Sequence, residues 1–276
     1  MTYFGVLVIF IGPPLVALGV WNWLDVRRGK TLGTGLLERL ALPVLLGHVV
    51  IALAYTTPWD NYLVATEVWW YDPDLVTGLT LGWVPIEEYT FFIVQTLLSG
   101  LLLLTLARYL PLIPHFRPQA GLRRNAVLVL GVLWLVSITP LLIGWDPGTY
   151  LALELGWALP PIMLQAGFGA DILWSRRRLV VPGILLPTVY LCLVDAIAIN
   201  SGTWTIDPSQ STGIMVGGVL PIEEVVFFFL TNTLVVLGMT LMLAEESHQR
   251  TRHLIARLRN QDERPQDIEH GLQTTE

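Results

Sequence analysis

Two glutamates open a long apolar run in the segment Pro85-Ile86-Glu87-Glu88-Tyr89-Thr90-Phe91-Phe92. The tetrapeptide returns 136 positions later as Pro221-Ile222-Glu223-Glu224, and phenylalanines again follow it, as Phe227-Phe228-Phe229. Proline suits the first turn of a helix, and glutamate suits the positive end of the helix dipole. Either copy alone therefore indicates a capped helix start. A carboxylate within an apolar helix is costly, however, so the duplication indicates a functional site.

The composition around these motifs is that of an integral membrane protein. Hydrophobic residues make up 53% of the 276 residues and charged residues 14%, against about 25% charged in a soluble domain. The single Cys192 excludes a disulfide framework within the chain and a cysteine-based metal cluster. The net charge of -6, without a basic patch interleaved with aromatic residues, argues against nucleic acid as a partner.

Apolar runs of about 18 or more residues predict transmembrane helices. Seven such runs occur, at residues 3–24, 40–57, 84–106, 126–143, 150–173, 179–199 and 219–243. The first is expected to stay in the membrane rather than act as a signal peptide, because no basic region precedes it and Arg27 and Arg28 follow it. The polar residues from Glu245 onward predict a short helix that fades into disorder.

The basic residues predict the orientation of these spans. All 16 Lys and Arg residues fall between the first and second, third and fourth, or fifth and sixth runs, or in the tail. Basic residues favour the cytoplasmic side of a membrane. The pattern therefore predicts a multi-pass cell-membrane protein with its N-terminus outside and its C-terminus in the cytoplasm.

The repeat extends beyond the glutamates. Asp60, Trp69 and Asp72-Pro73 recur 135 positions later as Asp195, Trp204 and Asp207-Pro208, and Pro13-Pro14 is echoed by Pro160-Pro161. Spans one to three thus repeat as spans five to seven. Because one helix separates the two units, both cross the membrane in the same direction, and both motifs lie on the same side.

The predicted fold is all-α and integral to the membrane, with seven transmembrane helices. Two parallel three-helix repeats, at residues 1–110 and 148–244, are joined by a linker that carries the fourth transmembrane helix, at 111–147. A charged cytoplasmic tail follows at 245–276.

The candidate catalytic residues are the four motif glutamates, Glu87, Glu88, Glu223 and Glu224. Glu88 and Glu224 each begin a polar stripe at helical spacing, so we expect them to be the more inward pair. Glu67 and Glu154 have no motif around them and are expected to matter less. The five His residues show no spacing typical of metal ligands, so no metal site is expected.

These motifs resemble those of the flavin-independent lycopene cyclases, which occur as two bacterial subunits, as half of a fungal bifunctional enzyme and as a fused archaeal chain. The resemblance rests on both Pro-Ile-Glu-Glu motifs, on the segment Thr57-Pro58-Trp59-Asp60-Asn61 and on the three-plus-three arrangement, and it covers residues 1–244. The chain is similar to the fused form. Its second repeat departs from the first where Ala196 takes the place of Asn61. The resemblance implies lycopene taken from the membrane lipid as substrate, β-ionone rings as product and no cofactor.

The implied ring closure is an isomerisation that begins and ends with proton transfer. Protonation of the terminal double bond gives a tertiary carbocation, which the neighbouring double bond attacks before a proton is lost. A carboxyl group in a dry site beside a second carboxylate favours its protonated form and can act as the acid. Aromatic faces can stabilise the cation, although any one aromatic alone is typical of an interfacial belt. The candidate substrate-binding residues are Trp59, Asp60, Trp69, Trp83, Phe91, Phe92, Asp195, Trp204, Phe227 and Phe228.

Other classes of membrane protein share single features with this chain. A retinal protein is excluded because the only lysine, Lys30, lies in a loop. A carotenoid hydratase would add water to the same carbocation. A small-solute transporter could share the parallel repeats, with helices broken at Pro160-Pro161 and Pro187. A flavin-dependent cyclase is disfavoured because no Gly-x-Gly-x-x-Gly follows a strand. The sequence leaves open whether the protein forms a homo-oligomer.

Overall fold

The computed structural model describes residues 1–111 and 116–262, most of which are helical. Within that part of the chain, seven helical segments are long and apolar enough to cross a membrane. The helices are α1 (Tyr3–Val6), α2 (Gly12–Arg27), α3 (Ala41–Ala65), α4 (Ile86–Tyr109), α5 (Ala120–Ser137), α6 (Thr139–Ile143), α7 (Thr149–Ser175), α8 (Arg177–Asn200), α9 (Ile222–Leu243) and α10 (Glu245–Asp262). The first span joins α1 to α2 through a π-helical turn, and the fourth joins α5 to α6. The predicted seven-span helical membrane protein is confirmed.

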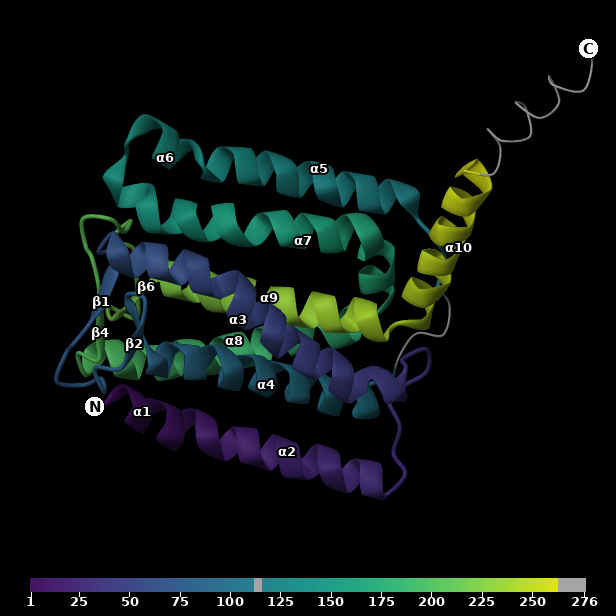
Figure 1. Cartoon of the computed structure of the whole chain (residues 1–276), viewed down its shortest axis with the longest axis horizontal. Coiled ribbons are helices and arrows are strands. Elements are labelled where there is room, and N and C mark those ends of the chain that lie inside the picture. The colour runs from purple at the N-terminus through teal and green to yellow at the C-terminus, as the bar shows by residue number, and fades with distance from the viewer. Residues whose placement is uncertain (112–115, 263–276) are drawn as a thin grey trace, which may run out of the picture.

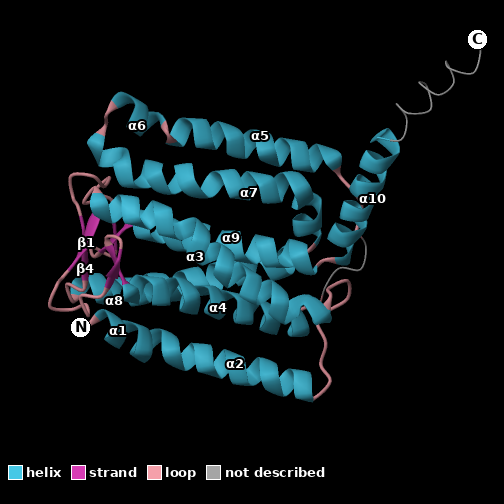
Figure 2. Ribbon diagram, in the orientation of Figure 1, coloured by secondary structure: helices cyan, strands magenta, loops and turns pink. Residues whose placement is uncertain are grey.

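Short strands gather at the end of the bundle that holds the N-terminus (Figure 2). They are β1 (Trp69–Tyr71), β2 (Thr80–Leu81), β3 (Val84–Pro85), β4 (Trp204–Ile206), β5 (Met215–Val216) and β6 (Leu220–Pro221). The strand β1 pairs antiparallel with β4, with Tyr71 opposite Trp204. This ladder ties the segment after α3 to the segment after α8. The all-α prediction did not include these strands. We call the end of the bundle that carries them the strand end.

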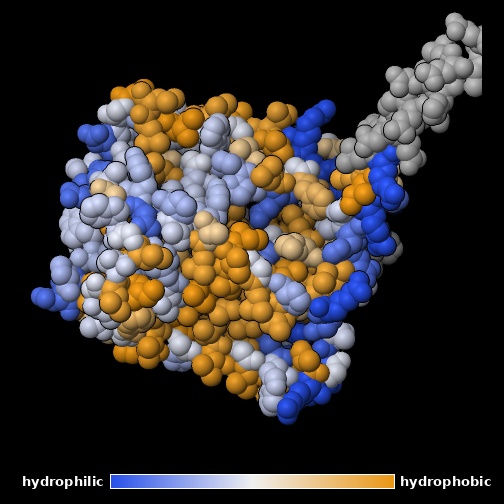
Figure 3. Space-filling model, in the orientation of Figure 1, coloured by the Kyte–Doolittle hydropathy of each residue, from blue (hydrophilic) through white to orange (hydrophobic). Residues whose placement is uncertain are grey.

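The opposite end of the bundle carries α10 (Figure 1). This end is rich in arginine, with Arg108, Arg176 and Arg250 among its residues. Five ion pairs lie among the described residues, and each takes its basic partner from this end: Lys30–Asp25, Arg108–Glu38, Arg123–Asp171, Arg176–Glu246 and Arg250–Asp171. In the space-filling view the middle of the bundle is apolar, and hydrophilic residues collect beside α10 (Figure 3). This distribution is that of a protein with lipid around its middle.

Helices α4 and α9, which begin with the two glutamate motifs, form the centre of the bundle. Gln95 donates a hydrogen bond to Thr231 at 2.9 Å, and Ser99 donates one to Asn232 at 2.5 Å. Such bonds between membrane helices contribute about 0.6 kcal/mol each on average. Gly100 of α4 permits the close approach, because a Cβ atom there would lie 2.9 Å from the Sδ atom of Met239 on α9. The polar stripes predicted on both helices therefore face each other.

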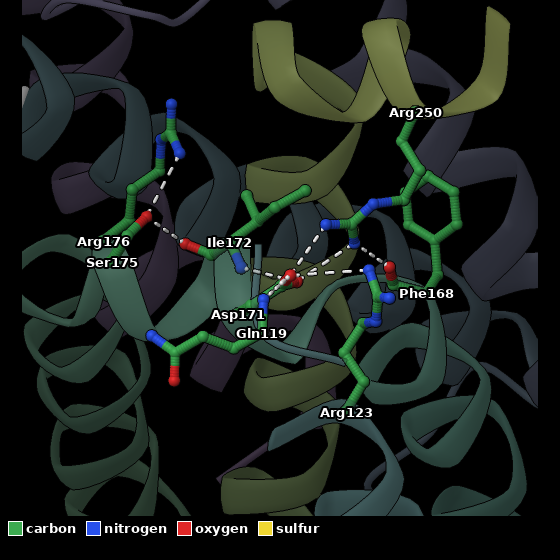
Figure 4. Close-up of polar contacts among 8 residues, drawn as sticks. All are labelled: Gln119, Arg123, Phe168, Asp171, Ile172, Ser175, Arg176 and Arg250. Carbon is green, nitrogen blue, oxygen red and sulfur yellow. Dashed lines mark hydrogen bonds and ion pairs between the residues drawn. The ribbon is translucent and has the colours of Figure 1, made fainter. Parts of the chain in front are cut away.

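Helix α10 is fastened to α7 by a buried carboxylate (Figure 4). Arg250 of α10 donates to Asp171 at 2.8 and 3.0 Å, and the backbone N–H of Gln119 donates to the same carboxylate at 3.0 Å. Asp171 follows Gly169, whose backbone is not helical although α7 continues through it. The predicted tail helix thus forms and docks on the bundle, while the disorder expected beyond it falls at residues 263–276, outside the described part.

The prolines within α7 and α8 do not break these transmembrane helices. Pro160 and Pro161 lie inside α7, and Pro187 lies inside α8. The backbone irregularity of α7 is at Gly169, closer to the arginine-rich end. The broken-helix feature expected of a transporter is therefore not found at these prolines.

Candidate active site

The two glutamate motifs bring Glu88 and Glu224 to one cavity at the strand end. Pro85 and Pro221 end short strands in extended conformation and start α4 and α9. Glu88 and Glu224 lie three residues further on, are only 8% and 7% exposed, and line the same cavity of about 50 Å³. Residues far apart in the sequence thus meet as the repeat predicted.

Tyrosine hydroxyls hold both carboxyl groups. Tyr3 and Tyr71 both donate to Oε2 of Glu88, the latter at 3.1 Å. Tyr150 donates to Oε1 of Glu224 at 2.6 Å. Burial, followed by the nearby charges of Glu88 and Asp60, raises the pKa of Tyr71 well above its ordinary value. Tyr71 therefore remains a protonated donor at neutral pH.

Three more acids are buried around this pair. Asp195 lines the cavity near Glu224 and accepts a hydrogen bond from the Trp204 indole at 3.0 Å. Both carboxyl oxygens of Asp60 and of Glu154 lack a hydrogen-bond partner within the described residues. None of these acids belongs to an ion pair in that part of the chain. Buried carboxyl groups without a cation cannot all be ionised together, so the cluster retains protons.

The other glutamate of each motif turns to the loops instead. Glu87 accepts a hydrogen bond from the backbone N–H of Thr77 at 2.6 Å. Glu223 does the same with Thr212, from the N–H at 2.7 Å and from the hydroxyl at 2.8 Å. Both side chains are buried, and neither lines the cavity. The structure therefore separates the four catalytic candidates into a cavity pair, Glu88 and Glu224, and a loop-holding pair.

The predicted substrate-binding aromatics divide in a similar way. Trp69, Phe91, Trp204, Phe227 and Phe228 line the cavity. The ring centroids of Phe91 and Phe228 are 6.2 Å apart, in an edge-to-face arrangement across the two motif helices. Trp59 lies behind this wall, stacked on Phe227 at 6.0 Å, and Phe92 faces a neighbouring groove. The structure does not bring Trp83 to the site, because its side chain is 68% exposed.

Tyr3, Tyr71, Tyr150 and Glu154 were missed as candidates. A signal for two of them exists, because the 147 positions that separate Pro13-Pro14 from Pro160-Pro161 also separate Tyr3 from Tyr150. The same spacing of 147 sets Glu154 against Leu7, and the repeat spacing of 135 sets Tyr71 against Ile206, so neither residue has a counterpart of its own kind. Glu154, which is expected to matter less than the motif glutamates, is fully buried beside Glu224. The two halves of the site are therefore unequal.

Comparison with known proteins identifies the family. A family model described as lycopene cyclase matches residues 31–106 and 147–242. The chain belongs to the lycopene cyclase family. It is 43% identical to the lycopene beta-cyclases of two Halobacterium salinarum strains, over 87% of this chain and 95% of theirs. It is also 39% identical to a bifunctional lycopene cyclase/phytoene synthase of Podospora anserina, over 69% of this chain and 33% of that protein.

The family assignment confirms the resemblance drawn from the motifs and makes the chain an enzyme of carotenoid biosynthesis. The names of these relatives support neither the hydratase nor the transporter alternative. No solved structure matches the chain. Within the described residues, no group of three His, Cys, Asp or Glu side chains is placed to hold a metal ion.

Proposed function

We propose that this membrane protein closes β-ionone rings on the ends of lycopene, by proton transfer at the cavity between Glu88 and Glu224. The observation that carries the proposal is that two motif carboxyl groups, from different helices, meet in a buried aromatic cavity. The likeness to lycopene beta-cyclases over most of the chain supports the substrate and product. No electrons are exchanged in this reaction, so it needs no redox cofactor.

The reaction balances without any co-reactant. One carboxyl group gives its proton to the terminal double bond, which leaves a tertiary carbocation. The neighbouring double bond attacks that carbon, a ring bond forms, and the positive charge moves into the ring. A carboxylate then removes a ring proton and restores a double bond. The product is an isomer of the substrate, and the site regains the proton it gave.

The surroundings of the two glutamates suggest different roles. Two tyrosine hydroxyls donate to Glu88, and hydrogen bonds to a carboxylate stabilise it. Glu88 is thus suited to accept the final proton. Glu224 lies with Asp195 and Glu154 in the part of the acid cluster that cannot be fully ionised, so we assign it the donor role. The faces of Phe91, Phe228 and Trp204 would stabilise the cation between them.

The arrangement in the membrane belongs to the same proposal. Residues 1–110 and 148–244 form two parallel repeats, and the fourth span falls between the two segments that the family model matches. The strand end lies outside the cell and the arginine-rich end in the cytoplasm, as the distribution of basic residues favours. Lycopene enters from the membrane lipid.

Substitution of the two glutamates tests the function. Glu88→Gln and Glu224→Gln keep the size of the side chain but remove proton transfer, so each should lower cyclisation of lycopene by about a hundredfold or more. Glu67→Gln is the matched control, because its side chain is exposed at the same end of the bundle. Near-normal cyclisation by both Glu88→Gln and Glu224→Gln would show that the motif serves only as a helix cap. A product heavier than lycopene by one water would indicate a hydratase instead.

A further inference from the structure

A second cavity runs along the bundle from the proposed active site. It is a groove of about 790 Å³ between α3 and α7, floored by α4 and α9. Ala52, Phe168 and Leu234 are among the mainly apolar side chains that line it. Ligand sites commonly measure about 300–1,000 Å³. The groove therefore has the capacity of a binding site, whereas the acidic cavity of about 50 Å³ cannot enclose a C40 polyene.

Both ends of the groove are closed by side-chain contacts. At the strand end, Tyr55 donates a hydrogen bond to the carbonyl of Trp157 at 2.8 Å, which bridges α3 and α7. At the arginine-rich end, His248 and Thr251 of α10 line the groove, and the ion pair of Arg250 with Asp171 holds α10 in place (Figure 4). Between these ends the groove follows α9 over about 15 residues, or roughly 22 Å.

The groove adjoins the acidic cavity and is open to lipid. Phe227 lines both spaces, so a rotation of one ring would connect them. Along the other side, Leu164 and Ile51 line the groove yet remain 76% and 55% exposed. In a helix pair that crosses the membrane, such side chains face the hydrocarbon. An apolar molecule could thus move sideways from the bilayer into the groove.

We propose that this groove holds the polyene chain of the substrate while one end of the molecule lies between Glu88 and Glu224. The proposal rests on the proposed function and adds where the substrate binds and where it enters, between α3 and α7. Several polar side chains in the groove are engaged within the protein: His48 bonds the carbonyl of Val44 at 2.7 Å, and Gln95 bonds Thr231. Oε1 of Gln165 and Oγ of Ser247 lack a partner among the described residues, but the rest of the lining is mainly apolar. A hydrocarbon rod therefore meets mainly apolar surface along its length.

The test fills the groove with one side chain. Ala52→Trp places an indole in the groove, and Ala54→Trp, two residues along the same helix, is exposed and lines neither space. We expect Ala52→Trp to raise KM for lycopene at least tenfold, and Ala54→Trp to stay within twofold of the unmodified protein. In the Glu88→Gln/Glu224→Gln background, Ala52→Trp should also lower the lycopene retained per purified protein at least tenfold.

Equal KM and equal lycopene retention in the two tryptophan variants would overturn the groove proposal. The proposal would also be overturned if Ala52→Trp lowered the amount of bilayer lipid bound to the protein but left the amount of bound lycopene unchanged. If Ala52→Trp is not recovered folded, Leu164→Trp at the exposed rim of the groove is measured in its place. Failure of the unmodified protein to cyclise lycopene would instead defeat the proposed function. Retention of lycopene that is blocked by Ala52→Trp would then still support the groove.

Discussion

Removal of one hydroxyl group from Tyr150 tests how the acids are held. Tyr150 is buried, and its hydroxyl donates to Oε1 of Glu224 at 2.6 Å. Its ring packs edge-to-face on Trp69, with centroids 5.2 Å apart. Tyr150→Phe keeps this ring packing and deletes only the hydrogen bond. The fold should therefore survive, while Glu224 loses the hydroxyl donor that the described residues provide.

The size of the effect follows from the strength of such a bond. Glu224, the proposed proton donor, becomes a carboxylate as its proton leaves, so the Tyr150 hydroxyl then donates to a charged group. A hydrogen bond to a charged group contributes about 1.5–3 kcal/mol, and each 1.36 kcal/mol changes a rate about tenfold. We expect kcat of Tyr150→Phe to fall by about 10- to 150-fold. Tyr3→Phe should cost less, about tenfold at most, because Tyr71 still donates to Oε2 of Glu88 at 3.1 Å.

The assay measures initial rates of lycopene cyclisation by purified protein over a range of substrate concentrations. A positioning role predicts that kcat falls while KM stays within about twofold, since Tyr150→Phe keeps the aromatic ring that lines the cavity. Tyr62→Phe is the control, because that side chain is 54% exposed on α3. A kcat for Tyr150→Phe within twofold of the unmodified enzyme would refute the reasoning.

Three further predictions concern the rest of the molecule. Because the folded pKa of Tyr71 is raised, its stabilising contribution is complete below the unfolded tyrosine value of about 10 and is lost as pH rises from there through the folded value. Tyr71→Phe should therefore leave the tyrosinate absorbance of the folded protein at about pH 10 unchanged, and a smaller absorbance would contradict this. Arg250→Ala should lower the free energy of unfolding by about 1–3 kcal/mol, seen as a lower Tm, because it removes one partner of the buried Asp171. The loss is limited because Asp171 keeps Arg123 at 3.4 Å and the Gln119 N–H as partners. An unchanged Tm would mean that this ion pair does not fasten α10. Tags after Asp74 and Ser209 should be reached from outside intact cells and a tag after Gln119 should not, while labelling of the Gln119 tag would reverse the proposed orientation.

The sequence predicted that Glu88 and Glu224 would come together, because the repeated motif and the apolar runs can be recognised without the fold. Seven apolar runs each had to become a helix, and the repeated motif placed Glu88 and Glu224 at helix starts on one side. The polar stripe was enough to favour these two as the inward pair. It could not show that Glu87 and Glu223 would bind Thr77 and Thr212, because those contacts depend on the path of the loops.

Other features depend on contacts between distant segments. Tyr3 reaches Glu88 because the first span packs beside α4, a pairing that no local pattern specifies. The strand pair β1 and β4 forms only once both loops meet at the same end. Trp83 shares the neighbourhood of the motif in sequence, yet its side chain points outward. Arg250 is one basic residue among many in the tail, and only the fold shows that Asp171 is its partner.

The most direct test of the central claim is cyclisation of lycopene by the purified protein in heavy water, without flavin, nicotinamide or added metal. Exchangeable carboxyl groups carry deuterium under these conditions. If buried carboxyl groups start and end the reaction, the product should be a cyclised isomer that retains one deuterium per ring, at the carbon that was protonated. Absolute dependence on reduced flavin, or rings formed without deuterium from the solvent, would contradict the proton-transfer mechanism.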